Sequence, residues 1–140
     1  MTAKETFEGL IAAFESKNLE SVMKYFAEDA VLYDPHYPVP RMMGTAAIRQ
    51  GMEWGLGNME KPGFAIRHYW DDGRVGAAEL DTHHVFKGGM ELKIDQVFVF
   101  EVEGNKFKRM QSYVPYSPPG ISGLLTKVTR LIWRLQGKLK

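Results

Sequence analysis

The fold is decided by one apolar stretch, Met90-Glu-Leu-Lys-Ile-Asp-Gln-Val-Phe-Val-Phe100, which is long and apolar enough to be a central β-strand. Hairpin-type turn signals surround it, and they lie at Asp71-Asp-Gly73, Lys87-Gly-Gly89 and Glu103-Gly-Asn105. These turns divide the region after residue 63 into predicted strands at about 64–70, 74–86, 90–102 and 106–116. Because long strands joined by tight turns are antiparallel neighbours, this half of the chain predicts an antiparallel meander.

The first sixty residues show helical periodicity instead. Thr2 and Glu5 form a capping-box pattern before a first apolar stripe, and Asn18 and Thr45 are candidate caps for a second and a third helix. Between the last two lies a short predicted strand, 30–34, which ends at a proline. Helices followed by a meander predict an α+β domain, in which three N-terminal helices cover one face of a curved antiparallel sheet and enclose a pocket.

The composition excludes several classes of function. The chain has 140 residues, a net charge of +1 and no cysteine, which favours a single domain and excludes thiolate nucleophiles and cysteine-held metals. The balanced charge argues against a nucleic-acid partner. We find neither a metal-ligand spacing nor a phosphate-binding glycine loop, so we expect no metal and no cofactor. Without a signal peptide or membrane span, the predicted location is the cytoplasm.

The C-terminal residues 118–140 form a separate electrostatic segment. Five basic residues and no acidic residue follow position 120, and apolar residues recur between them at helical spacing. We expect an amphipathic helix that belongs to the same single domain as residues 1–117. Two ways of burying its apolar stripe remain possible. The helix could dock on the domain or on a partner subunit, or residues 121–140 could make peripheral contact with a membrane.

Carboxylates and imidazoles are the candidate catalytic groups. Asp34 ends an apolar strand beside a proline, which indicates either a turn or a group at the mouth of the pocket. Asp95 lies in the central strand on the face of Val97 and opposite Gln96, so its carboxyl should be raised in pKa or paired with a cation, such as Lys93 or an arginine of a neighbouring strand.

Histidines offer a second set of candidates. His68 lies near the end of a predicted strand, where it could act with Asp34 as an acid–base pair. His83 and His84 are adjacent in a strand and therefore point to opposite faces, so at most one of them lines the pocket.

One segment carries a family resemblance. Phe26-Ala-Glu-Asp-Ala-Val-Leu-Tyr-Asp-Pro35, followed by Pro40 and Gly44-Thr-Ala-Ala-Ile-Arg49, resembles the ketosteroid isomerase branch of the NTF2-like, SnoaL-like superfamily. The resemblance covers about residues 5–116 and implies an NTF2-like cone. It also implies that Asp34 is the base that moves a proton and that Asp95 donates a hydrogen bond to the developing oxyanion.

The resemblance fails at one catalytic position. Where the family has an oxyanion-hole tyrosine on the first helix, this chain has Leu10. Replacement donors could come from Tyr33, Tyr69, Tyr113 or His68. Together with Val97 and Phe86, these three tyrosines are the side chains that we expect to bind substrate.

These residues predict an enzyme that moves a proton on an apolar, ring-sized carbonyl or hydroxy compound, as ketosteroid isomerases do. Two alternatives stay open: a SnoaL-like dehydratase or cyclase that uses Asp34 and His68, and a non-catalytic module that binds a hydrophobic ligand or a partner. A limonene-epoxide hydrolase, which has the same fold, is less favoured. Such enzymes have a further carboxylate after the last strand, and this chain has no acidic residue near that position, Pro115. The family resemblance also implies a homodimer.

Overall fold

The structure is a computed structural model, and it describes residues 1–115 and 120–138. Its helices are α1 (Ala3–Glu15), α2 (Leu19–Met23), α3 (Thr45–Asn58) and α4 (Gly120–Leu135). Its strands are β1 (Phe26–Tyr33), β2 (Arg41–Met43), β3 (Met59–Lys61), β4 (Phe64–Asp71), β5 (Val75–Phe86), β6 (Glu91–Glu103) and β7 (Lys106–Tyr113).

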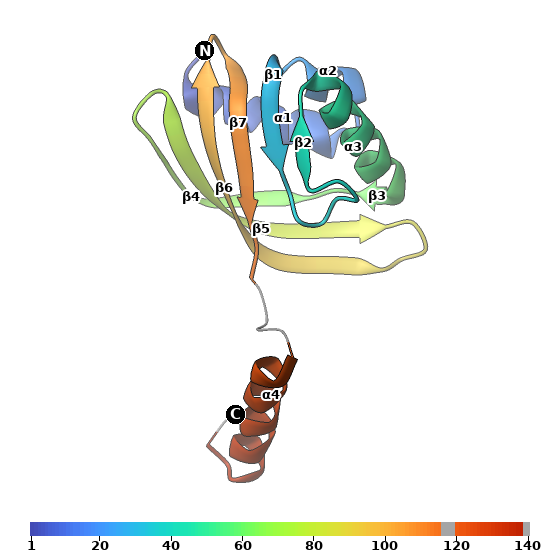
Figure 1. Cartoon of the computed structure of the whole chain (residues 1–140), viewed down its shortest axis with the longest axis vertical. Helices are drawn as coiled ribbons and strands as arrows, with labels where there is room; N and C mark the ends of the chain where they lie inside the picture. The colour runs from blue at the N-terminus through green and yellow to red at the C-terminus, as the bar shows by residue number, and fades with distance from the viewer. Residues whose placement is uncertain (116–119, 139–140) are drawn as a thin grey trace.

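The strands form one curved sheet in the order β2-β1-β7-β6-β5-β3, with β4 paired to β5. Helices α1, α2 and α3 gather on one face of this sheet, and α4 lies apart from it (Figure 1). The predicted α+β cone with three N-terminal helices is therefore confirmed. Two details differ from the prediction: β1 pairs with β7 in parallel, and the short strands β2 and β3 were not predicted.

Local signals set the helix ends. Thr2 and Glu5 form the predicted capping box, and the Asn18 side chain accepts a hydrogen bond from the backbone N–H of Ser21. Thr45 is not a cap: α3 begins after Gly44, whose φ of 84° favours glycine, and no side chain caps it. The caps of α1 and α2 were predictable because their side-chain oxygens directly precede an apolar stripe.

The core lies between α1 and the inner face of the sheet. Phe7, Phe100 and Phe107 are fully buried, and the Phe7 ring stacks on Phe100 with 5.1 Å between centroids. Such aromatic packing anchors the N-terminal helix on the central strands. These ring contacts therefore hold α1 against β6 and β7.

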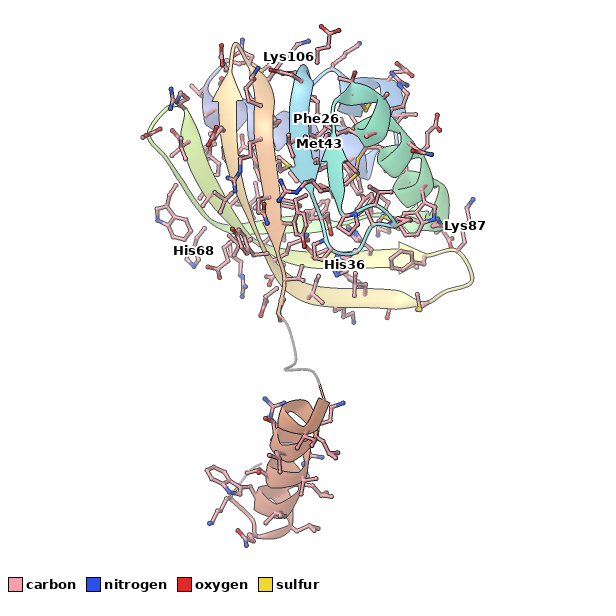
Figure 2. The ribbon with its side chains drawn as sticks, in the orientation of Figure 1. Phe26, His36, Met43, His68, Lys87 and Lys106 are labelled. Carbon is pink, nitrogen blue, oxygen red and sulfur yellow. The ribbon has the colours of Figure 1, made fainter. Side chains whose placement is uncertain are left out.

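A β-bulge interrupts β4, since its pairing with β5 shifts between Ile66 and His68. Strict alternation from Phe64 and Ile66 would turn His68 toward the helices. The extra residue, Arg67, shifts the side chains that follow by one position, and His68 is exposed. Figure 2 shows His68 pointing away from the domain.

The C-terminal helix α4 falls within the segment predicted to be helical. Of that segment, residues 118, 119, 139 and 140 lie outside the described residues. Within residues 1–115 and 120–138, no helix is long and apolar enough to cross a membrane. The domain boundary near residue 117 stays a prediction, as does the homodimer.

Candidate functional site

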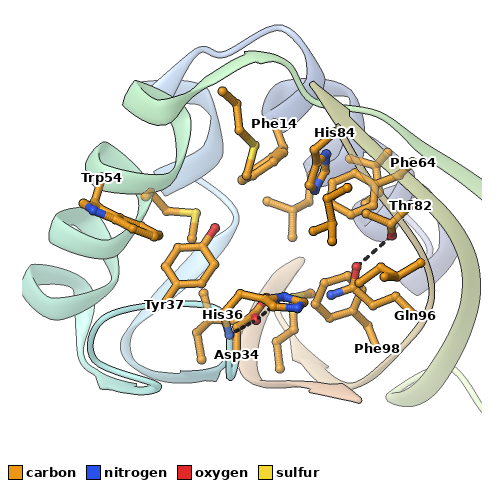
Figure 3. A pocket seen from close by; sticks show the side chains of 18 of the residues that line it. Phe14, Asp34, His36, Tyr37, Trp54, Phe64, Thr82, His84, Gln96 and Phe98 are labelled. Atoms are coloured by element: carbon orange, nitrogen blue, oxygen red, sulfur yellow. Dashed lines mark hydrogen bonds and ion pairs between the residues drawn. The ribbon is translucent and has the colours of Figure 1, made fainter. Parts of the chain in front are cut away.

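An apolar cavity of about 100 Å³ lies between the helices and the inner face of the sheet. Most of its lining is aromatic or aliphatic, including Phe14, Phe64 and Phe98 (Figure 3). Polar side chains are few among the lining residues, and they are Asp34, His36, Tyr37, Thr82, His84 and Gln96. The cavity therefore combines an apolar binding surface with a small set of groups that can do chemistry.

Asp34 follows directly after β1, on the same face as the buried Leu32, and is itself only 7% exposed. Its Oδ1 accepts a hydrogen bond of 2.9 Å from the backbone N–H of His36 and lies 3.2 Å from His36 Nδ1. Burial raises the pKa of the Asp34 carboxyl, and the contacts with His36 partly oppose this shift. The sequence allowed either a turn or a pocket position for Asp34, and the structure combines both.

His84 faces the cavity from β5 and is 5% exposed. Its Nδ1 accepts a hydrogen bond of 3.0 Å from the backbone N–H of Gly63, which assigns the ring proton to Nε2. Burial lowers the pKa of His84 to about 4, and the neighbouring charges of His36 and His83 act in the same direction. At neutral pH this residue is therefore an uncharged imidazole whose Nε2–H can donate to a ligand.

Glycine at position 63 makes this arrangement possible. A Cβ at Gly63 would lie 2.7 Å from the backbone oxygen of His83, closer than real contacts of this kind. The Gly63 carbonyl also accepts a hydrogen bond of 2.9 Å from the His83 N–H. The close approach of these two backbones holds the Gly63 donor against His84.

Among the described tyrosines, Tyr37 is the one that lines the cavity. It is 9% exposed, and a Cβ at Gly55 would lie 2.8 Å from its hydroxyl, so the glycine in α3 leaves room for this ring. Burial and the charge of Asp34 both raise the pKa of Tyr37. Its phenol therefore stays neutral and can donate a hydrogen bond.

A buried polar chain crosses three strands beside the cavity. Thr82 Oγ1 donates to Gln96 Oε1 at 2.7 Å, and Gln96 Nε2 donates to Ser112 Oγ at 2.6 Å. All three side chains are at most 3% exposed. The two hydrogen bonds fix the orientation of the Gln96 amide, since its oxygen and one of its N–H groups are occupied.

The structure corrects the position of Asp95. Its side chain is 68% exposed and lies on the outer face of the sheet, where Oδ1 is 2.9 Å from Arg67 Nη2. Because side chains alternate along a strand, Gln96 faces the cavity in its place. The ion pair with an arginine was one of the two outcomes that the sequence left open, and an oxyanion contact in this cavity does not fit this position.

His68 is corrected as well. It does not line the cavity but stacks on Trp70, with 5.7 Å between ring centroids. The bulge at Arg67 accounts for this outward position. His36 and His84 are the histidines that line the cavity. Because neighbouring residues of β5 point to opposite faces, His83 lies outside the cavity, 3.1 Å from Glu91.

Of the five predicted substrate-binding residues, only Phe86 lines the cavity. Tyr33 alternates with Leu32 and Asp34 and packs under Arg41, while Val97 is paired with the exposed Tyr113 on the outer face. Tyr69 is partly buried and packs against Phe7 of the core. Leu10 does line the cavity, so the position where the family has a tyrosine is apolar here.

Four polar residues of the cavity were not predicted from the sequence, His36, Tyr37, Thr82 and Gln96, and neither was the donor property of His84. Strand parity could have found Gln96, because it shares a face with Phe98. No sequence signal points to Tyr37, which lies in the proline-rich loop after β1, or to the hydrogen bond from Gly63 to His84.

Comparison with known proteins supports this architecture. A family profile described as SnoaL-like domain matches residues 7–110, whereas no curated protein matches the chain in sequence. A putative SnoaL-like polyketide cyclase from Shewanella denitrificans superposes with a TM-score of 0.71 at 18% identity, over 81% of this chain and 90% of its own.

Two further structures are similar. A hypothetical protein with ketosteroid isomerase-like fold from Catenulispora acidiphila, in complex with trimethylamine, has a TM-score of 0.71 at 19% identity, over 84% of this chain and 89% of its own. A computationally designed 17-OHP binder has a TM-score of 0.73 at 16% identity, over 83% and 94%. At such identities the solved structures show the fold alone, an NTF2-like cone. The profile match, which spans most of the chain, shows that this protein belongs to the SnoaL-like domain family.

Proposed function

We propose that this protein is a small-molecule enzyme in which Asp34 moves a proton on an apolar, ring-sized carbonyl compound. One observation carries the proposal: a buried carboxylate of raised pKa and a neutral imidazole donor line the same apolar cavity. A raised pKa makes a carboxylate a stronger base near neutral pH, and a neutral donor can stabilise a developing oxyanion.

The proposed reaction starts with Asp34 taking a proton from the carbon next to the carbonyl. The electron pair of that C–H bond moves to the oxygen, which becomes an enolate and accepts a hydrogen bond from His84 Nε2–H. Asp34 then returns the proton to a second carbon, which completes an isomerisation without any net gain or loss of atoms. Because the pKa of His84 is about 4, the imidazole serves as a donor rather than as a source of a full proton.

Ring chemistry on small molecules also fits the family. The relative from Shewanella denitrificans is described as a putative polyketide cyclase, and the designed relative as a 17-OHP binder. Aldol cyclisation and dehydration begin with the same proton removal, so the reaction class of this protein is isomerase, cyclase or dehydratase. In a dehydratase, His36 would take the place of His68, because it lines the cavity beside Asp34.

The second candidate is a module that binds an apolar ligand without turning it over. Leu10 favours it, because an apolar group lines the cavity where ketosteroid isomerases have a tyrosine donor. Loss of one oxyanion donor typically lowers a rate by about 10²–10³.

Deuterium exchange separates the two candidates. A cyclic β,γ-unsaturated ketone is incubated with the protein in D₂O, and NMR follows both exchange at the carbon next to the carbonyl and formation of the conjugated isomer. We expect exchange with the native chain and a loss of about 10²–10⁴ in rate for Asp34→Asn.

Asp95→Asn is the matched control, because it removes a carboxylate from the outer face and should leave the rate unchanged. Exchange at the native rate in a folded Asp34→Asn protein would refute the proposed base. Ligand-induced shifts in the protein spectrum without any exchange would identify the binding module instead.

A further inference from the structure

Helix α4 exposes a continuous apolar face. Seven side chains at spacings of three and four residues are between 43% and 79% exposed, and they are Ile121, Leu124, Leu125, Val128, Leu131, Ile132 and Leu135. Exposed apolar surface of this extent normally marks an interaction site. We therefore expect another surface to bury these seven side chains.

The polar side of α4 is basic. Lys127, Arg130 and Arg134 lie along the helix, Lys138 follows it, and no acidic residue occurs between positions 120 and 138. The Lys138 ammonium lies 5.5 Å from the centroid of the half-exposed Trp133 ring. Basic residues and a tryptophan beside an apolar stripe are typical of helices that lie at a membrane surface.

The outer face of the sheet is not a favourable packing surface for this apolar stripe. Arg67 lies there at the centre of an ion-pair network, 3.1 Å from Glu79, 3.2 Å from Asp81 and 2.9 Å from Asp95. Burying these charges under leucine and isoleucine side chains would cost free energy without new partners.

A second copy of α4 is also a poor cover. Paired helices are usually held in register by opposite charges that flank the apolar seam. Among the described residues, α4 has cations on its flank and no carboxylate to pair with them. Two copies would bring like charges together, whereas an anionic lipid surface offers the opposite charge.

We propose that α4 is a peripheral membrane-binding helix that inserts its apolar stripe into the interface of an anionic bilayer. With 16 residues the helix is about 24 Å long, which is too short to cross a hydrocarbon core of about 30 Å. It lies in the plane of the membrane, with leucine and isoleucine side chains among the acyl chains and the cations at the lipid phosphates.

Vesicle sedimentation with the full chain tests the proposal. One vesicle is phosphatidylcholine alone, and the other contains equal amounts of phosphatidylcholine and phosphatidylglycerol. We expect strong binding to the anionic vesicle and little to the neutral one. The triple variant Lys127→Glu, Arg130→Glu, Arg134→Glu should bind the anionic vesicle at least about a hundredfold more weakly, since each basic residue near such a surface contributes about a fivefold factor.

Two further variants make the result specific. Lys24→Glu, Lys61→Glu, Lys106→Glu reverses three exposed charges away from α4 and should keep most of the binding. Leu124→Ser with Leu131→Ser keeps every charge but removes apolar contact, and it should weaken binding as well. Circular dichroism of the free proteins checks that each variant is folded.

Three outcomes would overturn the proposal: no binding to either vesicle, equal binding to both vesicles, or equal loss of binding in the two charge-reversal variants. A dimer that the Leu124→Ser, Leu131→Ser variant no longer forms would assign the stripe to a second copy. None of these readouts depends on the reaction at Asp34.

Discussion

Asp34 and His84 are shifted in pKa by the same physical cause, because burial in the apolar cavity disfavours the charged form of each. The Asp34 carboxylate therefore binds its proton more tightly in the folded state than in the unfolded state. Stability contributed by this group is present at low pH and is lost as pH rises through its folded pKa. The ionised carboxylate therefore destabilises the fold at neutral pH. Such a loss of stability is common for groups with a catalytic role.

We predict that Asp34→Asn raises the midpoint of thermal unfolding at neutral pH while it lowers turnover by about 10²–10⁴. The amide cannot ionise, and its oxygen can still accept the hydrogen bond from the His36 N–H. Calorimetry of the two proteins measures the difference. A lower midpoint for Asp34→Asn would mean that the ionised carboxylate stabilises the fold.

The stability contribution of His84 changes with pH in the opposite direction. Its pKa of about 4 lies below the usual 6.5, so its contribution to stability is complete above about pH 6.5 and is lost as pH falls toward 4. Integrated over this window, the loss is about 2–3 kcal/mol. We predict that urea unfolding of His84→Gln shows a flatter pH dependence than the native chain across this range. His68→Gln, at an exposed site, is the control and should keep the native slope.

At the scale of elements, the cavity depends on how the start of β4 meets β5. Gly63→Ala would place a Cβ 2.7 Å from the His83 oxygen and push the two backbones apart. The hydrogen bond from Gly63 N–H to His84 Nδ1 would lengthen, and the imidazole would no longer be held in one tautomer. We predict a loss of about 1–3 kcal/mol in the free energy of unfolding and a lower kcat.

Gly57→Ala is the matched control for that substitution. Nothing lies within 4 Å of the Cβ it would add, and it replaces a helical glycine in α3. We expect it to stabilise the protein by about 0.5–1 kcal/mol and to leave kcat unchanged. Equal losses in both variants would show that position 63 has no special role.

Elements also explain how far the sequence could predict the site. Periodicity and turn residues predicted the helices, the meander and the position of Asp34, because these depend on local contacts. The family resemblance suggested Asp95, but parity in β6 puts Gln96 at the cavity. His68 could not be assigned, because a bulge one residue earlier reverses its face and has no signal of its own in the sequence.

At the scale of the whole molecule, the SnoaL-like domain and α4 are nearly independent in packing. Among the described residues, the large fully buried side chains, such as Phe7 and Ile48, all lie before residue 113, and the stripe of α4 is exposed. We predict that a chain truncated after residue 117 unfolds at the same temperature as the full chain, because no core surface is uncovered.

The truncated chain should also keep its rate on a water-soluble ketone, since, in the part of the chain that the structure describes, every residue that lines the cavity precedes position 111. It should lose binding to the anionic vesicle. Calorimetry, the exchange rate and vesicle sedimentation on the same two proteins measure all three properties. A fall of several degrees in the unfolding midpoint would show instead that α4 docks on the domain and stabilises it, in which case the apolar stripe is covered by the protein itself rather than by lipid.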